Sequence, residues 1–284
     1  MTFGPAIRLH CWGGYGSQLL ALAFALDLTK SIPGRNVVIV FHSNGVSHRP
    51  LEIGQLLGNL RFRELDDFPQ SKMSKEVQTS KRVPFVKLVK KVLTSMRIVL
   101  TDENLKEPAR IFPWTLEIRG HYSYRKISNS TLEEITRRIL TLNNPLERTA
   151  DILVHYRLGD LLILDSKSFV PGDLLTSLIQ DCMSRLQSEP QVLIATENPS
   201  EARSFLKLAS NSKNVEFANY DPTSTIKLGL ASQIFIGSNS KLSLWISILR
   251  AHRSSTQVSY LPSSLVENLE AIFSGDFSQV KSYL

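Results

Sequence analysis

The sequence has few cysteines and no long apolar segment. Its two cysteines, Cys11 and Cys182, lie in different halves of 284 residues, so neither a disulfide framework nor a four-cysteine zinc site is expected, and both should be buried, inert thiols. The longest apolar run, residues 19–26, is far shorter than the roughly 20 residues that cross a bilayer. No basic region leads into an apolar stretch near Met1. We therefore expect a cytoplasmic protein without a membrane span.

Several motifs that carry chemistry are also missing. No Asp-x-Asp pair occurs, which is a common way to hold a divalent ion on a diphosphate, and no His, Cys, Asp and Glu residues cluster with metal-ligand spacing. The Walker loop and the G-x-S-x-G nucleophile elbow are absent as well. The sequence therefore predicts no bound metal, and it disfavours P-loop and serine hydrolases.

The composition is that of a globular protein with an uneven charge. With 42% hydrophobic and 21% charged residues, the chain can bury a core, and its length favours two domains over one. Residues 1–145 carry 21 Lys and Arg against 12 Asp and Glu, whereas residues 146–284 carry 12 against 14, which gives +9 and −2. We expect a domain boundary at Pro145. The basic half could attract nucleic acid, an anionic membrane or an acidic substrate, and charge alone does not choose among these.

Strand-like and helix-like segments alternate along the chain. In the first part we expect strands at residues 6–11, 36–41, 97–101 and 114–118, and helices at 17–31 and 130–142. In the second part we expect strands at 151–157, 191–196, 215–218, 233–237 and 257–261, and helices at 171–187, 200–209, 222–231, 241–251 and from 263 onward. Such alternation predicts an α/β protein with parallel sheets, whose ligands bind where the strands end.

The first loop of interest is glycine-rich and follows the first expected strand. Gly14, Gly16 and Ser17 precede a helix, where glycines let the backbone approach a ligand and free N–H groups favour an anion. The loop does not fit the dinucleotide fingerprint, because the third glycine would fall at Leu19. An ordinary strand-to-helix turn is an equally good interpretation.

The second loop follows the strand that begins the second half. His155, Arg157 and Asp160 end this strand, with a glycine at the bend, and Arg157 could offer two parallel N–H groups to a phosphate. Alternatively, His155 is a core histidine whose hydrogen bonds are satisfied internally, and Asp160 caps the next helix.

The third loop combines small polar side chains with a helix start. Ser238, Asn239 and Ser240 lie between a strand and a helix, where hydroxyls, an amide and unpaired N–H groups can bind phosphate without a metal. Ser240 could instead be only an N-cap.

Three ordered motifs resemble those of the bacterial α-1,2-fucosyltransferases. They are GGYGSQ at Gly13–Gln18, HYRLGD at His155–Asp160 and SNSKLSLW at Ser238–Trp245, which are similar to the GG-x-GNQ, H-x-RRGD and ANSTFSWW-type motifs of that family. The resemblance implies a GT-B fold of two facing Rossmann-like domains, with residues 1–145 on the acceptor side and 146–284 binding the nucleotide sugar. It also implies metal-free, inverting transfer from GDP-fucose to a glycan hydroxyl in surface polysaccharide synthesis, with no cofactor.

The resemblance also implies roles for individual residues. His155 would contact the nucleoside, Arg157 would neutralise the leaving β-phosphate, and Ser238–Ser240 would hold the diphosphate. The general base is Asp160 or Glu197. The rest of the implied donor site consists of Gly14, Gly16, Ser17, Thr196, Asp221 and Thr225.

The chain departs from the family pattern at three positions. Ser17 stands where the family has asparagine, Leu158 replaces a second arginine, and Thr225 replaces an acidic residue, with Asp221 one turn upstream. These departures weaken the assignment of guanine and fucose more than that of phosphate. The alternatives are a degenerate nucleotide-binding protein without turnover and a transferase for another nucleotide sugar.

One segment of the basic half has the pattern of an amphipathic helix. Within Lys81–Arg97, apolar residues including Val92 and Met96 share one face, while Lys87, Lys90 and Lys91 point away. This pattern fits either a helix packed on the core or a peripheral contact with an anionic inner membrane, where a lipid-linked glycan acceptor would lie. A nucleic-acid partner is not expected, because the basic residues do not belong to a recognition motif.

Overall fold

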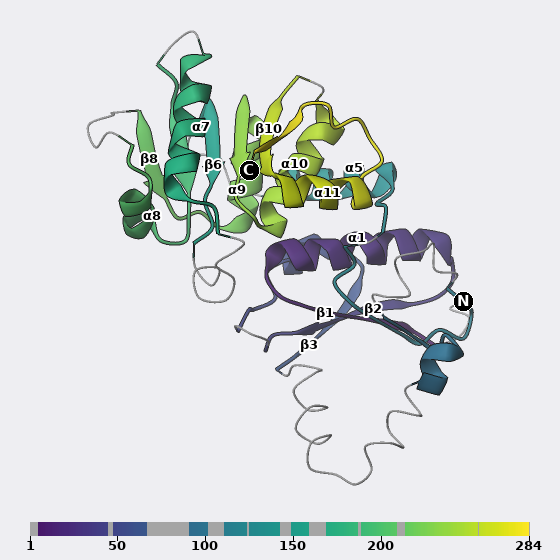
Figure 1. Ribbon diagram of the computed structural model, residues 1–284. Helices are drawn as coiled ribbons and strands as arrows, with labels where there is room; N and C mark the ends of the chain where they lie inside the picture. The colour runs from purple at the N-terminus through teal and green to yellow at the C-terminus, as the bar shows by residue number, and fades with distance from the viewer. Residues whose placement is uncertain are drawn as a thin grey trace. The chain divides into compact units, whose positions relative to one another are not determined.

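The chain forms two compact units. The computed structural model describes residues 5–44, 48–66, 91–101, 111–123, 125–142, 149–158, 169–186, 189–208, 214–254 and 256–283. One unit spans Met1–Ile135 and the other Thr136–Leu284 (Figure 1). The division falls within helix α5 (Asn129–Thr141), whereas the boundary expected at Pro145 lies outside the described residues.

The first unit is built on a parallel sheet of five strands. Their order is β3-β2-β1-β5-β4, with neighbouring pairs parallel throughout. The strands are β1 (Ile7–Trp12), β2 (Val37–His42), β3 (Arg61–Leu65), β4 (Val99–Thr101) and β5 (Glu117–Arg119). Helix α1 (Tyr15–Ser31) packs on β1 and β2 and is buried nearly all round, as its apolar sequence predicted. The unit also contains a 3-10 turn, η1 (Gly54–Leu56).

The second unit is built on a parallel sheet of six strands in the order β11-β10-β9-β6-β7-β8. Counted from its first strand, this is the order 3-2-1-4-5-6 of a Rossmann fold. The strands are β6 (Ile152–His155), β7 (Val192–Ala195), β8 (Val215–Ala218), β9 (Ile234–Gly237), β10 (Val258–Pro262) and β11 (Val280–Tyr283). The helices are α7 (Gly172–Ser184), α8 (Pro199–Phe205), α9 (Pro222–Ala231), α10 (Lys241–Arg253) and α11 (Ser263–Ile272).

The core follows from this layering. Strands β6, β7 and β9 are buried at every residue, because helices cover both faces of a parallel sheet. The predicted α/β class, with two Rossmann-like units and parallel sheets, is confirmed. Cys11 and Cys182 are buried and free, as expected, and burial raises the pKa of the Cys11 thiol to about 12. Strands β3 and β11 were not predicted; both lie at sheet edges and lack a run of apolar residues.

A buried arginine anchors helix α10 to the second sheet. The guanidinium of Arg250 is inaccessible to solvent and donates to the carbonyl of Ser232 (2.8 Å), the carbonyl of Val258 (2.9 Å) and the hydroxyl of Ser259 (3.0 Å). Because a buried charge is costly unless it is fully hydrogen-bonded, these contacts hold α10 in one position. These contacts lie at the last turn of α10, and the helix start follows the end of β9 after three residues.

Candidate functional site

The strand order of the second sheet reverses between β6 and β9, although the two strands are parallel. From β6 the chain builds the sheet outward through β7 and β8, and from β9 it builds the other side through β10 and β11. His155 is the register partner of Gly237, so the two strands end side by side. Ligands of open α/β sheets bind outside the carboxyl ends of the strands at such a point. The structure therefore brings the second and third loops of interest together at one edge.

Ser238 ties the two loops to each other. Its backbone N–H donates to the carbonyl of His155 (2.9 Å), and its hydroxyl accepts the N–H of Arg157 (2.9 Å). From the far end of the chain, the hydroxyl of Tyr283 donates to the carbonyl of Gly237 (2.6 Å). Because the buried Ser238 hydroxyl is used within the protein, its observed role is to position Arg157.

His155 is buried and faces the first turn of α10. Its Nδ1 lies 2.8 Å from the hydroxyl of Ser243 and 3.4 Å from that of Ser240. Burial, and next the charge of Arg157, lower the pKa of His155 to about 3. The imidazole is therefore neutral at pH 7, and its described contacts are those of the internally satisfied histidine that the sequence left open as an alternative.

The start of α10 has the features of an anion site. Ser240 is the N-cap, and its hydroxyl accepts the N–H of Ser243 (3.1 Å). The next N–H, that of Leu244, donates to the carbonyl of Ser240 (3.1 Å), and the N–H groups of this first turn carry the positive end of the helix dipole. Asn239 is only half-buried, so its amide is accessible at this point. Gly237 is required for the close approach, since a Cβ there would lie 2.6 Å from the Cβ of Ser243.

Arg157 is a cationic residue near this helix start, where Lys241 is the first residue of α10. It is half-buried, and its backbone is held by Ser238. Leu158, which stands where the fucosyltransferases have a second arginine, is fully buried in the core of the second unit. This position thus serves packing, and the motif contributes one guanidinium instead of two.

Two further site residues follow the neighbouring strand β7. Thr196 is buried, its N–H donates to the carbonyl of Ala218 (3.0 Å), and its hydroxyl has no partner among the described groups. Glu197 is exposed at the same edge. Both lie one strand away from His155.

The residues after β8 serve as a helix cap. Asp221 is the N-cap of α9, where its carboxylate accepts the N–H (3.0 Å) and the hydroxyl (2.5 Å) of Ser224. The hydroxyl of the buried Thr225 donates to the carbonyl of Asp221 (3.0 Å). Strand β8 is the edge strand, separated from β6 by β7. The observed contacts of both residues therefore stabilise α9.

The remaining predicted residues lie elsewhere. Asp160 is outside the described residues. Gly14, Gly16 and Ser17 belong to the first unit, where Gly14 is the N-cap of α1 and Gly16 is buried in that helix. Just before them, Gly13 has a φ of +94°, a conformation that favours glycine.

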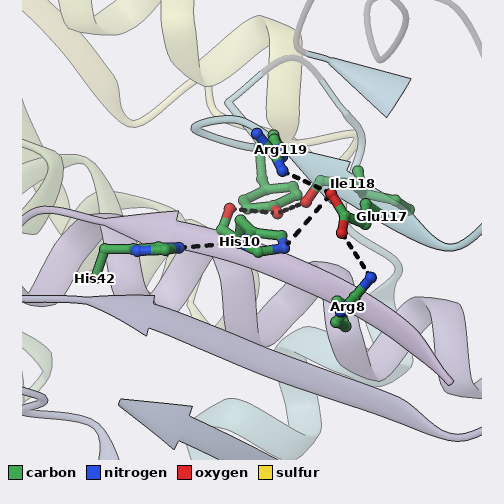
Figure 2. Close-up of polar contacts among 7 residues, drawn as sticks. Arg8, His10, His42, Glu117, Ile118 and Arg119 are labelled. Atoms are coloured by element: carbon green, nitrogen blue, oxygen red, sulfur yellow. Dashed lines mark hydrogen bonds and ion pairs between the residues drawn. The ribbon is translucent and has the colours of Figure 1, made fainter. Parts of the chain in front are cut away.

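Sequence reasoning missed several residues near the strand ends. Ser243 lies within the third motif, which predicted no role for it, yet it contacts His155, and Tyr283 reaches β9 from an unpredicted strand. In the first unit, His10 and Glu117 form a polar cluster with neighbouring arginines (Figure 2). The available signal was the alternation of residue types in β1, where the polar Arg8 and His10 alternate with the apolar Ile7, Leu9 and Cys11.

The described residues contain neither a metal-binding cluster nor a membrane-spanning helix. No group of three or more His, Cys, Asp or Glu side chains in the described ranges could hold a metal ion. No helix in the described part of the chain is long and apolar enough to cross a membrane.

Comparison with known proteins shows a shared fold. No protein-family model and no curated protein matches the sequence. Among solved structures, E. coli heptosyltransferase WaaC with ADP is 12% identical, covering 98% of this chain and 94% of that chain at a TM-score of 0.51. The same enzyme with ADP-2-deoxy-2-fluoro heptose is 12% identical (98% and 93% covered, TM-score 0.50). The UDP-GlcNAc 2-epimerase from Methanocaldococcus jannaschii is 10% identical (98% and 89% covered, TM-score 0.51).

At this identity the likeness concerns the fold alone. The two parallel-sheet, Rossmann-like units of this chain match those of GT-B glycosyltransferases. Since an epimerase matches as well as a transferase does, the fold does not decide the reaction.

Proposed function

We propose that this protein is a glycosyltransferase that binds a nucleotide sugar at the carboxyl edge of its second sheet. The observation that carries this proposal is the position of Arg157 near the N-terminus of α10, at the point where the strand order of the sheet reverses. A guanidinium and the positive end of a helix are groups that suit a diphosphate. The heptosyltransferase with the same fold is solved with ADP and with an ADP-sugar, which agrees with this class of ligand.

The proposed reaction is an inverting, metal-independent transfer. An acceptor hydroxyl forms a bond to the anomeric carbon while the bond from that carbon to the diphosphate breaks, and the electron pair leaves with the diphosphate. Arg157 and the first N–H groups of α10 stabilise the negative charge that develops there. The hydroxyl proton passes to a carboxylate, for which Glu197, exposed at the end of β7, and Asp160 are the candidates.

In this proposal His155 is a positioning residue that holds the start of α10 in place. Its neutral ring joins the end of β6 to the hydroxyls of Ser240 and Ser243 in the cap of α10. The ring therefore keeps the helix start aligned with Arg157, and its contact with the nucleoside remains part of the proposal. Thr196, Asn239, Asp221 and Thr225 complete the proposed donor site within the second unit, and a donor-binding role for Gly14, Gly16 and Ser17 of the first unit stays a prediction from the sequence.

For the donor sugar we propose GDP-fucose, and for the acceptor a glycan hydroxyl in surface polysaccharide synthesis. The support is the order and spacing of the three motifs that resemble those of the α-1,2-fucosyltransferases. No cofactor or metal is needed in this proposal, because Arg157 and the helix start supply the positive charge.

A donor screen tests the proposal. The purified protein is incubated with GDP-fucose and with other GDP-, UDP- and ADP-sugars, with and without glycan acceptors, and nucleotide release is measured. Release of GDP that depends on an acceptor supports fucosyl transfer, and the same result with another sugar corrects only the donor. Conversion of a nucleotide sugar without an acceptor would indicate an epimerase. Binding of GDP by calorimetry without release from any donor would indicate a degenerate binding protein.

A peripheral membrane contact through Lys81–Arg97 is a further part of the proposal. Only residues 91–97 of this segment are described; residues 91–95 are helical, and Val92 and Met96 are 46% and 57% exposed. Beside them Trp114 is 53% exposed, and its indole N–H donates to the carbonyl of Met96 (2.9 Å). Exposed apolar side chains next to basic ones fit the surface of an anionic bilayer.

Liposome sedimentation tests this contact. We expect binding to anionic but not to neutral liposomes, with loss of binding at high salt and in a variant with Lys87, Lys90 and Lys91 replaced by glutamine, because each basic residue near such a surface contributes about 1 kcal/mol. Equal, salt-independent behaviour with both liposome types would remove the membrane from the proposal.

A further inference from the structure

The first sheet has two faces of opposite character. Along β1, Ile7, Leu9 and Cys11 are buried in the core, and they alternate with Arg8 and His10, which point to the opposite face. Strands of a parallel sheet usually read as apolar runs, because helices cover both faces. The polar residues of β1 therefore call for an explanation other than packing.

Strand register places more polar side chains on the same face. Glu117 and Arg119 of β5 are the partners of Arg8 and His10. Arg61 and Arg63 of β3 join this face through Val38 and Val40 of β2. This face carries the side chains Arg8, His10, Arg61, Arg63, Glu117 and Arg119, so four arginines stand against one carboxylate.

The central residues of this face form a connected chain (Figure 2). Nδ1 of His10 lies 2.9 Å from Nε2 of His42. On its other side, Nε2 of His10 lies 4.0 Å from Oε2 of Glu117. Each oxygen of Glu117 pairs with an arginine, since Arg8 is 2.7 Å from Oε1 and Arg119 is 2.7 Å from Oε2.

Within this group of connected side chains, two buried nitrogen atoms lack a hydrogen-bond partner among the described groups. Nε2 of His10 and Nε of Arg119 are inaccessible to solvent and make no hydrogen bond to any described group. His10 as a whole is only 9% exposed. Buried polar atoms are nearly always hydrogen-bonded in native proteins, so such atoms mark a place where a ligand completes the network.

The spacing indicates what kind of group would complete it. An oxygen about 2.8 Å from both Nε2 of His10 and Oε2 of Glu117 would bridge their separation with an angle of about 90° at that oxygen. Because Nε2 of His10 is inaccessible to solvent in this structure, neighbouring side chains must move aside when such an oxygen binds. A hydroxyl suits this position, because it accepts one hydrogen bond from the imidazole and donates another to the carboxylate. The half-buried ring of Trp12, two residues after His10 on the same face, adds an apolar surface beside them.

The charges indicate what else the ligand carries. The arginine excess on this face attracts an anion, and guanidinium groups bind carboxylates and phosphates with two parallel hydrogen bonds. Burial, and next the charge of Arg119, lower the pKa of His10 to about 4, so its ring is neutral at pH 7. Burial alone would raise the pKa of Glu117, but the hydrogen bond and charge of Arg119, together with the charge of Arg8, hold it below its usual value, so this carboxylate stays ionised.

From this geometry we propose that His10, Glu117 and Arg119 form a binding site for an acidic sugar, meaning a polyhydroxy ligand with a carboxylate or a phosphate. The bridging hydroxyl lies between His10 and Glu117, and the anionic group lies against the arginines. The hydroxyl of Tyr122 donates to the carbonyl of His10 (2.7 Å) and holds β1 in place for this contact. If the proposed transferase function holds, this ligand is the acceptor.

The test follows the ring signals of His10 by NMR in the full-length protein labelled at histidine. The probes are glucuronic acid, glucose 6-phosphate, glucose and inorganic phosphate, and the His10 signal is assigned by its loss in His10→Gln. We expect the two acidic sugars to shift the His10 signal, with glucose binding at least about tenfold more weakly. A stronger response to one acidic sugar identifies the anion as carboxylate or phosphate.

Variants separate this site from general effects of charge. Glu117→Gln keeps the shape but removes the carboxylate, and Arg119→Lys keeps the charge but removes the planar fork, so each should weaken binding of the acidic sugars about tenfold. The matched control is His48→Gln, which changes an exposed histidine of the same unit and should leave binding unchanged.

Three outcomes would overturn the inference. One is an unshifted His10 signal in the wild-type protein with both acidic sugars, which needs no variant to fold. Another is equal affinity for inorganic phosphate and glucose 6-phosphate, which would leave an anion site without the hydroxyl contact. The third is unchanged binding in folded Glu117→Gln. A parallel titration with GDP separates the two proposals, because failure to bind GDP counts against the donor site alone and not against the acidic-sugar site.

Discussion

Acid should destabilise the second unit through His155. Burial and Arg157 lower the folded-state pKa of this histidine from 6.5 to about 3. When the unit unfolds, the ring regains its ordinary pKa, so between these values the unfolded state binds a proton that the folded state does not. The stability that depends on a neutral His155 is therefore fully present above pH 6.5. It is lost progressively as the pH falls from 6.5 towards the folded-state pKa of about 3.

The expected loss of unfolding free energy follows from the pKa of His155 in the unfolded state, 6.5. One proton contributes about 1.4 kcal/mol per pH unit below 6.5, so the free energy of unfolding should drop by about 2 kcal/mol between about pH 7.5 and about pH 5.0. This figure is insensitive to the exact folded-state value, because about pH 5.0 still lies well above it.

Trp245 provides the assay. It is fully buried in the second unit, and the other two tryptophans, Trp12 and Trp114, belong to the first. Urea unfolding is followed by Trp245 fluorescence in a background with Trp12→Phe and Trp114→Phe, at several pH values. His155→Gln should be less stable near pH 7.5, because the contact with Ser243 is altered, but its stability should depend less on pH.

A second variant separates the effect of His155 protonation from a general loss of stability. The control is Leu244→Ala in the same helix, α10, which removes buried apolar contacts but no titratable group, so it should lower stability and keep the wild-type pH dependence. If His155→Gln keeps it too, the reasoning is wrong. Should that variant not fold, direct NMR titration of the His155 ring in the wild-type protein decides, and an ordinary pKa would refute the prediction.

Three further predictions concern the proposed donor site. Arg157→Lys should lower turnover about a hundredfold in the nucleotide-release assay, since lysine loses the fork, whereas Arg253→Lys on the exposed end of α10 should not; equal rates for Arg157→Lys and wild type would contradict the assignment. Turnover should survive EDTA, and a requirement for magnesium or manganese restored by titration would count against the metal-free mechanism. Gly237→Ala should cost about 1–3 kcal/mol in urea unfolding and weaken GDP binding, because its Cβ would lie 2.6 Å from the Cβ of Ser243; an unchanged midpoint would show that α10 can move.

The pattern of the sequence was enough for the class of fold and for the places where loops leave the sheets. Helix α1 and strands β6 and β9 were predictable, because apolar periodicity and turn residues are local properties of the chain. The edge strands β3 and β11 were not, because their residues are polar and they become strands only by pairing with a neighbour. The motifs also placed polar residues at the ends of β6 and β9, where a ligand of this fold binds.

Tertiary structure alone decided which of these ends meet and what each side chain does there. Strand order joins β6 to β9, and only then does the Ser238 hydroxyl reach the backbone of Arg157, 81 residues away. The same holds for His10 and Glu117, which come from distant strands and meet because β5 pairs with β1. The physical reason is that strand order follows from how the crossover helices pack on the sheet, and no local pattern of residues encodes it.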